Sequence, residues 1–322
     1  MKALSVKLRH LRQRLKGVRK LFFLCALAAA LTPAQSAVRA PKQILLAPYS
    51  EGKGKTTRIA FLVFQSSGFE IGKPVVNITT HRLDDDEPAF LADSTGFLFT
   101  SNRDGRQFDV FRYDIKSKAV AQVTRTPEDE WEPQASGDGR TITVVRGPER
   151  RLWRINIDGS DAGPVSPHPG GVVAHASLPP RSMAAIVQAD TNTRALQLID
   201  TATGTAETIE SAIGRSFFIR PDRTSIGFLK TVPDGSLVMR EWTVATRKAR
   251  ETGFALEGAD SITCTPAGAL LTARRSKVFV FEAETDRWYE IADLDKSRVR
   301  SIERLAVSPD AKWIAIVSSA VK

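Results

Sequence analysis

A short turn recurs six times along this 322-residue chain, at a nearly constant spacing of 42 to 45 residues. Its positions are Ala92-Asp93, Gly137-Asp138, Pro179-Pro180, Pro221-Asp222, Pro266-Ala267 and Pro309-Asp310. Each turn is followed by a short apolar run, such as Ile142 to Val145, which predicts a buried strand. Regular spacing of this kind is hard to obtain by chance, so the chain is predicted to repeat one structural unit.

The clearest copy of the unit spans residues 87–125 and contains four β-rich runs separated by polar turns. The predicted strands are Pro88 to Leu91, Phe97 to Thr100, Val110 to Tyr113 and Val120 to Thr124. One such sheet cannot bury both of its faces, so it needs neighbours on either side. Four strands in roughly 40–45 residues are typical of a β-propeller blade.

The two ends of the repeat region are incomplete in complementary ways. Arg58 to Phe64 and Pro74 to Thr79 are two strands without a preceding pair, and Leu305 to Val307 and Trp313 to Val317 are two without a following pair. Joined around a ring, they would form one shared blade and remove exposed sheet edges. The predicted fold is therefore an all-β, six-bladed propeller of four-stranded antiparallel blades, closed by both chain ends, over residues 58–322.

The first 37 residues have the pattern of a secretory signal peptide. Eight Lys and Arg residues lie in the first 20 positions, an apolar core runs from Leu21 to Leu31, and small residues follow at Ala34 to Ala37. The core is shorter than the roughly 20 residues needed to span a bilayer, so an uncleaved anchor is the alternative. We expect residues 1–37 to be removed, residues 38–57 to form a linker, and the protein to be periplasmic.

Charge and cysteine content change when that segment is set aside. The formal charge of +10 arises mainly from the eight basic residues, because 38 basic residues then face 36 acidic ones. A balanced chain gives no electrostatic reason to bind nucleic acid. Cys264 is the one cysteine left and is predicted to be a buried structural thiol.

Several repeat residues resemble those of the TolB-type propeller repeats. They are Pro221-Asp222, Ser308-Pro309-Asp310, Thr100-Ser101-Asn102-Arg103-Asp104-Gly105 and the blade-closing Val123-Thr124. The resemblance covers about residues 59–318 and is degenerate in 174–210 and 258–292. It implies a six-bladed propeller exported across the inner membrane of a bacterium, and it leaves open a role as a periplasmic docking platform. TolB itself carries an N-terminal α/β domain, for which the roughly twenty residues of the linker leave no room.

Equivalent positions of the repeats predict a ring of polar side chains at the mouth of the central channel. Two acidic stretches, Asp84 to Glu87 and Glu128 to Glu132, precede the first strands of successive units. The same offset around the ring gives the candidate binding residues Glu87, Glu132, His175, Arg215, Asp260 and Arg304, with Trp131 as an exposed aromatic anchor. Such a mixed-charge mouth suits a peptide that carries both signs. A solvated surface and a channel Ca²⁺ site are the alternatives.

Catalysis is not predicted. The chain lacks a Gly-x-Ser-x-Gly elbow and a Cys-x-x-Cys-His haem attachment pattern. Lactonase-type propellers hold a metal through Glu, Asp and Asn side chains, but the equivalent positions here supply Glu87, Glu132 and Asp260 without an Asn. We therefore expect a non-catalytic, monomeric protein that binds an envelope protein or peptide without a cofactor. A metal-dependent hydrolase of the lactonase type is the alternative.

Overall fold

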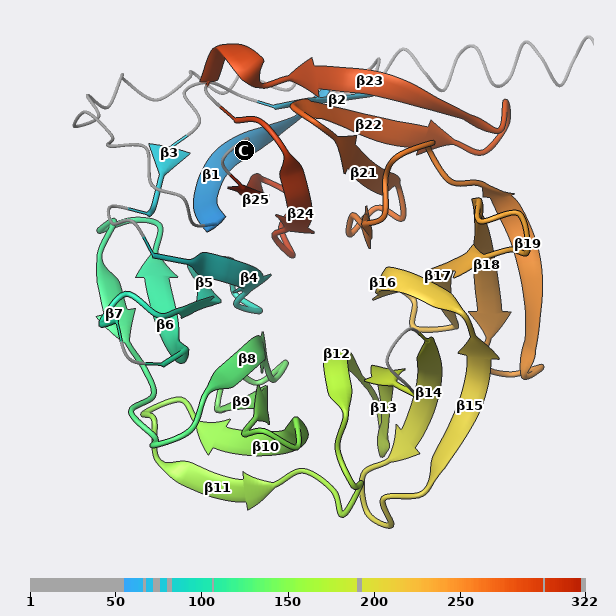
Figure 1. The fold of residues 1–322 in the computed structure, drawn as a ribbon. Coiled ribbons are helices and arrows are strands. Elements are labelled where there is room, and N and C mark those ends of the chain that lie inside the picture. The colour runs from blue at the N-terminus through green and yellow to red at the C-terminus, as the bar shows by residue number, and fades with distance from the viewer. Residues whose placement is uncertain are drawn as a thin grey trace, which may run out of the picture. The chain divides into compact units, whose positions relative to one another are not determined.

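Figure 1 shows the chain as a computed structural model. It describes residues 55–65, 68–71, 76–79, 83–105, 107–189, 193–297 and 299–319, all within the compact unit Leu46–Lys322. The predicted signal peptide and the linker up to residue 54 lie outside these residues. Within the described ranges, no helix has both the length and the apolar character to cross a bilayer.

Five antiparallel sheets each consist of four strands that are consecutive in sequence. The first contains β4 (Asp85–Phe90), β5 (Gly96–Ser101), β6 (Asp109–Asp114) and β7 (Val120–Gln122), and the second contains β8 (Glu130–Ala135), β9 (Thr141–Arg146), β10 (Arg151–Asn156) and β11 (Asp161–Pro164). The third contains β12 (Val172–Leu178), β13 (Ser182–Gln188), β14 (Arg194–Asp200) and β15 (Ala206–Ser211). The fourth contains β16 (Ile213–Ile219), β17 (Ser225–Thr231), β18 (Leu237–Thr243) and β19 (Lys248–Phe254). The fifth contains β20 (Ile262–Cys264), β21 (Leu270–Arg274), β22 (Lys277–Glu282) and β23 (Arg287–Asp293), which a short 3-10 helix η1 (Asp295–Ser297) follows.

One further sheet combines strands from both ends of the described chain, in the order β2-β1-β25-β24. Its strands are β1 (Lys55–Gln65), β2 (Gly68–Ile71), β24 (Ile302–Val307) and β25 (Trp313–Ser319), and the two-residue β3 (Val76–Asn77) also pairs with β1. β1 and β25 are antiparallel, from Lys55 opposite Ser319 to Phe61 opposite Trp313.

This sheet corrects two parts of the prediction. The structure has five four-stranded blades, not six. The remaining sheet has five strands, which come from both ends of the described chain. The predicted strand Pro74 to Thr79 is represented among the described residues by the two-residue β3, which pairs with β1 at Arg58 and Ile59. The prediction missed β2, which pairs with β1 from Leu62 to Gln65. Only two residues separate β1 from β2, a spacing that favours a hairpin.

The sheets surround a central space with their first strands innermost (Figure 1). These strands contact one another in the cyclic order β4, β8, β12, β16, β20, β24 and back to β4. The hydrophobic clusters among the described residues lie between neighbouring sheets; one, for example, joins Leu196 of β14 to Phe228 of β17. Second strands are therefore buried on both faces, as Phe97, Leu98 and Phe99 of β5 are. Each sheet stabilises its neighbours, as the repeat spacing predicts.

A repeated polar contact also ties strands together within the first two blades. Arg103 follows β5, donates to both oxygens of the buried Asp85 at 3.0 Å and lies 4.7 Å from the centre of the Phe111 ring. Arg146, the last residue of β9, makes a similar contact in the next blade, with an ion pair to Glu128 at 2.7 Å and the Trp153 ring at 4.8 Å. The arginine of the TolB-like segment at 100–105 thus has a structural role in this chain.

Candidate functional site

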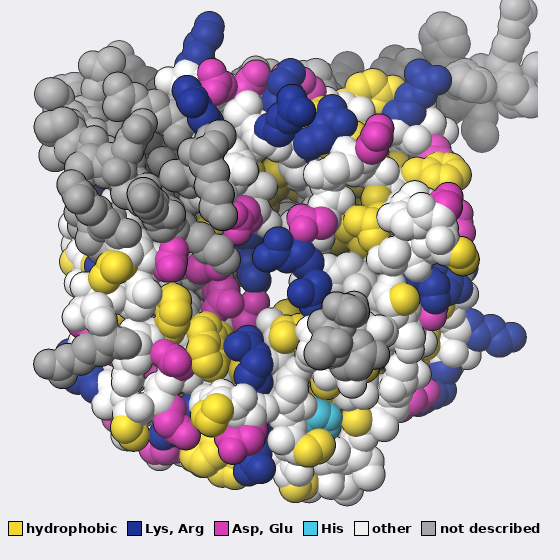
Figure 2. Space-filling model, viewed as in Figure 1, with side chains coloured by type: hydrophobic (Ala, Val, Ile, Leu, Met, Phe, Trp, Pro, Cys, Tyr) yellow, Lys and Arg dark blue, Asp and Glu magenta, His cyan; other side chains and the backbone are white. Residues whose placement is uncertain are grey.

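The first strands enclose a cavity of about 350 Å³ along the centre of the ring. Residues from all six innermost strands line it, including Asp86, Glu132, His175, Arg215, Cys264 and Arg304. Figure 2, which has the same viewing direction as Figure 1, shows acidic and basic side chains together around this central hollow. The cavity is therefore the mixed-charge channel that the repeat offsets predict.

β-Bulges lie at two carboxylates beside this channel, of which Glu132 lines the cavity and Glu87 does not. The register of β4 against β5 shifts between Asp86 and Ala89, and that of β8 against β9 shifts between Trp131 and Gln134. Glu87 and Glu132 occupy these bulges with φ of 56° and 50°. A residue with side-chain bulk takes a positive φ only where the surrounding structure enforces it, and bulges commonly redirect side chains at functional sites.

Arg304 of β24 reaches past β4 to form a two-pronged ion pair with Glu132 of β8. Its Nη2 lies 2.8 Å from Oε1 of Glu132 and its Nη1 lies 3.0 Å from Oε2. Nε of Arg304 is 4.0 Å from Oδ1 of Asp86. Glu87 joins the group because its Oε2 accepts hydrogen bonds from the Glu132 backbone N–H at 2.6 Å and from Thr100 Oγ1 at 2.8 Å. We call Asp86, Glu87, Glu132 and Arg304 the acidic cluster.

Three carboxyl groups and one guanidinium in so small a space cannot all be ionised without repulsion. Burial, together with the charges of Glu132 and Asp86, raises the pKa of Glu87 to about 8. Burial lowers the pKa of the Arg304 guanidinium, but the attraction of Glu132, Asp86 and Glu87 outweighs it and the pKa is raised. At neutral pH, Glu87 is thus mostly protonated and Arg304 is charged.

His175 of β12 is buried in the channel wall and is 3% exposed. Its Nε2 lies 3.0 Å from Thr143 Oγ1, whereas its buried Nδ1 has no hydrogen-bond partner among the described residues. Burial lowers the pKa of the imidazole to about 4, so His175 is neutral at physiological pH. Among the described residues no third group holds Nδ1, so the His175–Thr143 contact lacks the orienting partner of a catalytic triad.

Arg215 and Asp260 lie at a more open part of the ring. Nη1 of Arg215 is 3.3 Å from Oδ2 of Asp260, and the two side chains are 54% and 53% exposed. Nearby, Ser216 Oγ accepts a hydrogen bond from the Ile262 backbone N–H at 2.8 Å and so ties β16 to β20. The exposed pair can separate at small cost to meet a ligand.

Trp131 does not occupy the predicted exposed position. Its ring packs against the cluster of Val145 and Leu152, and the Arg150 guanidinium lies 4.5 Å from the ring centre. Trp131 and Glu132 are neighbours in β8, and successive side chains of a strand point to opposite faces. Glu132 therefore lines the channel, whereas Trp131 is directed between sheets.

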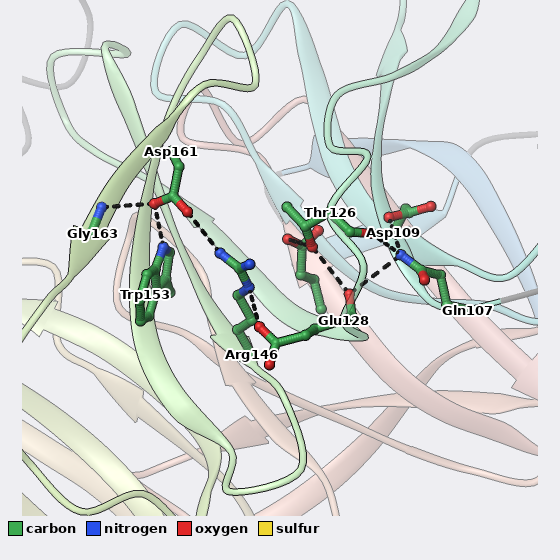
Figure 3. Close-up of polar contacts among 9 residues, drawn as sticks. Gln107, Asp109, Thr126, Glu128, Arg146, Trp153, Asp161 and Gly163 are labelled. Carbon is green, nitrogen blue, oxygen red and sulfur yellow. Dashed lines mark hydrogen bonds and ion pairs between the residues drawn. The ribbon is translucent and has the colours of Figure 1, made fainter.

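Most of the second acidic stretch is also structural rather than a channel loop. Figure 3 shows Arg146 between Glu128 and Asp161, with ion-pair distances of 2.7 and 2.9 Å. Glu130 is buried, accepts a hydrogen bond from Thr126 at 2.7 Å, and has a pKa raised by burial. Asp129 accepts a hydrogen bond from the Phe108 backbone N–H. Of the acids from Glu128 to Glu132, only Glu132 lines the cavity.

The structure thus brings Glu87, Glu132 and Arg304 together and separates them from the Arg215–Asp260 pair. Asp86, Thr100 and Thr143 also belong to this site, although the repeat offsets did not single them out. Thr100 of β5 donates to Glu87 within its own blade, whereas Thr143 of β9 contacts His175 of the next blade. The two threonines occupy different positions of their strands, so the repeat pattern gives no common signal for them.

Of the three acids considered as metal ligands, Glu87 and Glu132 lie together and Asp260 lies apart from them. Asp260 pairs with Arg215, and Glu132 is bonded to Arg304. In the part of the chain that the structure describes, no group of three or more His, Cys, Asp or Glu side chains has an arrangement suited to a metal ion. Cys264 lines the channel and is partly buried, and burial raises the pKa of its thiol.

Solved structures with the same architecture fall into several functional classes. A TolB-type protein from Agrobacterium tumefaciens superposes with a TM-score of 0.63 at 12% identity, covering 83% of this chain and 99% of that one. A gluconolactonase from Xanthomonas campestris superposes with a TM-score of 0.56 at 11% identity, covering 72% of this chain and 86% of that one. An oligogalacturonate lyase from Vibrio parahaemolyticus superposes with a TM-score of 0.51 at 12% identity, covering 83% of this chain and 98% of that one. The fold is a β-propeller. At these identities the likeness extends to the fold alone.

Sequence comparison adds nothing to this. No protein-family model matches the chain, and no curated protein matches it.

Proposed function

We propose that this chain is an exported, TolB-like, six-bladed propeller that binds a protein or peptide at the mouth of its central channel, without catalysis. The sheet β2-β1-β25-β24 would be the sixth blade. The observation that carries the proposal is the acidic cluster, in which Arg304 pairs with Glu132 and Asp86 beside a protonated Glu87 at the channel cavity.

The cluster indicates which chemical group the partner would present. Arg304 is paired to Glu132, and Glu87 beside this pair holds a proton at neutral pH. A lysine, arginine or terminal ammonium that enters the cavity would favour the ionised form of Glu87 and release that proton. The partner would therefore carry a basic group, and its acidic groups could meet Arg215 once Asp260 moves away.

The proposal is tested by selecting peptides from a random display library, with the full-length protein as the immobilised target. We expect the selected peptides to be enriched in Lys or Arg and to bind about threefold to fivefold more weakly to Arg215→Ala/Asp260→Ala, since a contact with a half-exposed charge is worth up to about 1 kcal/mol. These side chains are half exposed, so their removal should leave the fold intact.

Arg140→Gln is the matched control, because Arg140 is exposed and lies outside the residues that line the channel. Selected peptides that bind the double variant as tightly as the native chain would rule out the channel mouth as their site.

Export is tested separately. The N-terminal sequence of the protein recovered from an envelope fraction should begin near residue 38 if residues 1–37 are a cleaved signal. A start at Met1 in a membrane fraction would instead indicate the uncleaved anchor.

The alternative function is a metal-dependent hydrolase of the lactonase type. It would require Ca²⁺ or another divalent ion to bind with about 1:1 stoichiometry in the channel and to be lost in Glu87→Gln/Glu132→Gln. Metal titration followed by lactone hydrolysis distinguishes it from the peptide-binding proposal, which requires neither.

A further inference from the structure

A second cavity, of about 460 Å³, lies where β8, β12 and β16 end, and it is distinct from the acidic cluster. It meets the channel cavity at Gln134, Ala176 and Ile219, which border both. Its volume is in the usual range of roughly 300–1,000 Å³ for small-molecule sites.

Four arginines line this cavity, and no aspartate or glutamate does. Arg154 comes from β10, Arg181 from the turn between β12 and β13, and Arg220 and Arg223 from the end of β16 and the turn after it. The channel cavity differs, since Asp86, Glu132 and Glu303 line it. The two cavities therefore have different charge character.

One of the four arginines is already neutralised. Nε of Arg220 lies 2.9 Å from Oε1 of Glu241, and its Nη1 donates to the Gly268 carbonyl at 2.8 Å. Arg223 is exposed and makes one long hydrogen bond, 3.4 Å, to the carbonyl of Ser177. Neither Arg154 nor Arg181 has a side-chain partner among the residues that the structure describes, although the charge of Asp200 acts on Arg181. Three guanidinium groups remain available around one cavity.

The rest of the lining is apolar or hydroxylic. Val165 and Met183, which are 7% and 4% exposed, contribute apolar surface, and Ser182 and Thr141 contribute hydroxyl groups. A guanidinium is a planar donor that matches carboxylate and phosphate oxygens in pairs, and its binding is strongest where no resident acid competes.

We propose that this cavity, the arginine pocket, binds a small organic ligand with an apolar body and at least two carboxylate or phosphate groups. Arg154, Arg181 and Arg223 hold the anionic groups, and Val165 and Met183 contact the body. The site does not depend on peptide binding at the acidic cluster, because the two cavities have different charged residues.

Calorimetric titration of the full-length chain at low ionic strength tests this with three probes: adipate, hexane-1,6-diyl bisphosphate and neutral adipamide. We expect saturable binding of at least one charged probe and none of adipamide, and the probe that binds identifies carboxylate or phosphate as the preferred group. Arg154→Gln/Arg181→Gln/Arg223→Gln should weaken that binding about tenfold or more. Arg140→Gln, which removes an exposed arginine outside the pocket, should not weaken it.

The proposal is overturned if the native chain binds neither charged probe, or if Arg140→Gln weakens binding as much as the triple variant does. The single variant Arg154→Gln repeats the comparison with one exposed side chain changed. If the triple variant does not fold, its loss of binding is not informative, and Arg154→Gln decides. Binding by Arg154→Gln that equals binding by the native chain then overturns the proposal.

Discussion

Arg304 and Glu132 are 172 residues apart in sequence, yet their side chains form two hydrogen bonds of 2.8 and 3.0 Å across the channel. The Arg304 side chain is 36% exposed and that of Glu132 is 5% exposed. The pair therefore joins the C-terminal part of the ring to its second blade at a point where water has limited access. Removal of either partner would leave a charge that is poorly solvated.

Arg304→Met should lower the free energy of unfolding by about 1–3 kcal/mol, less than for a fully buried pair because Arg304 is partly exposed. The loss arises because the buried Glu132 side chain loses both hydrogen bonds from Arg304. Urea unfolding at neutral pH measures it. Arg215→Met is the matched control, since its pair with Asp260 is half exposed and should change stability by about 0.5 kcal/mol or less. Equal losses in the two variants would show that the Arg304–Glu132 pair has no special role.

Glu87 should make the protein less stable as the pH rises. Its pKa is 4.5 in the reference state and about 8 in the folded chain. Between these values the folded state holds a proton that the unfolded state has lost, so the free energy of unfolding falls with pH by up to about 1.4 kcal/mol per pH unit. Glu87→Gln keeps the acceptor for Thr100 and the Glu132 N–H but cannot ionise. We expect the variant to match the native chain at about pH 5 and to exceed it in stability at about pH 9.

His175 should act in the opposite direction at acidic pH. Its pKa is about 4 in the folded chain against an ordinary value of 6.5, so the unfolded state binds more protons between these values. The free energy of unfolding from this group therefore falls as the pH decreases through that window. An NMR titration, with the signal assigned from His175→Gln, should give a midpoint near 4. A midpoint near 6.5 would mean that the imidazole is solvated rather than buried.

The repeat spacing predicted four of the residues that reach the channel, because a place in the repeat fixes a place in the blade. Glu132, His175, Arg215 and Arg304 come from different blades and line one cavity, whereas Glu87 and Asp260, selected by the same offset, do not line it. Regular hydrophobic runs likewise predicted the doubly buried second strands. The channel positions and the buried strands were predictable because both follow from the periodic pattern of residues along the chain.

Other features of the site and fold could not be predicted, because they depend on contacts between residues that are far apart in sequence or on strand register. The direction of Trp131 follows from the register of β8, and a one-residue change of register reverses every side chain of a strand. The pairing of Arg304 with Glu132 requires a side chain to pass an intervening strand, so equivalent repeat positions could not predict it. The strand Gly68–Ile71 was missed because only two residues separate it from β1, and the repeat pattern gives no signal there.

Gly96 ends the first of the recurring turns and provides the sharpest test of the packing between β5 and β6. A Cβ atom at Gly96 would lie 2.1 Å from the backbone oxygen of Tyr113, which the sheet holds in place. Gly96→Ala should therefore cost about 2–4 kcal/mol of unfolding free energy, since the backbone must shift to relieve the overlap. Gly137→Ala is the control in the next turn, where a Cβ meets nothing within 4 Å, and it should change stability by about 0.5 kcal/mol or less. Thermal and urea unfolding of both variants measure these changes in the free energy of unfolding. Similar stability of Gly96→Ala and Gly137→Ala would show that β5 and β6 lie farther apart than the structure has them.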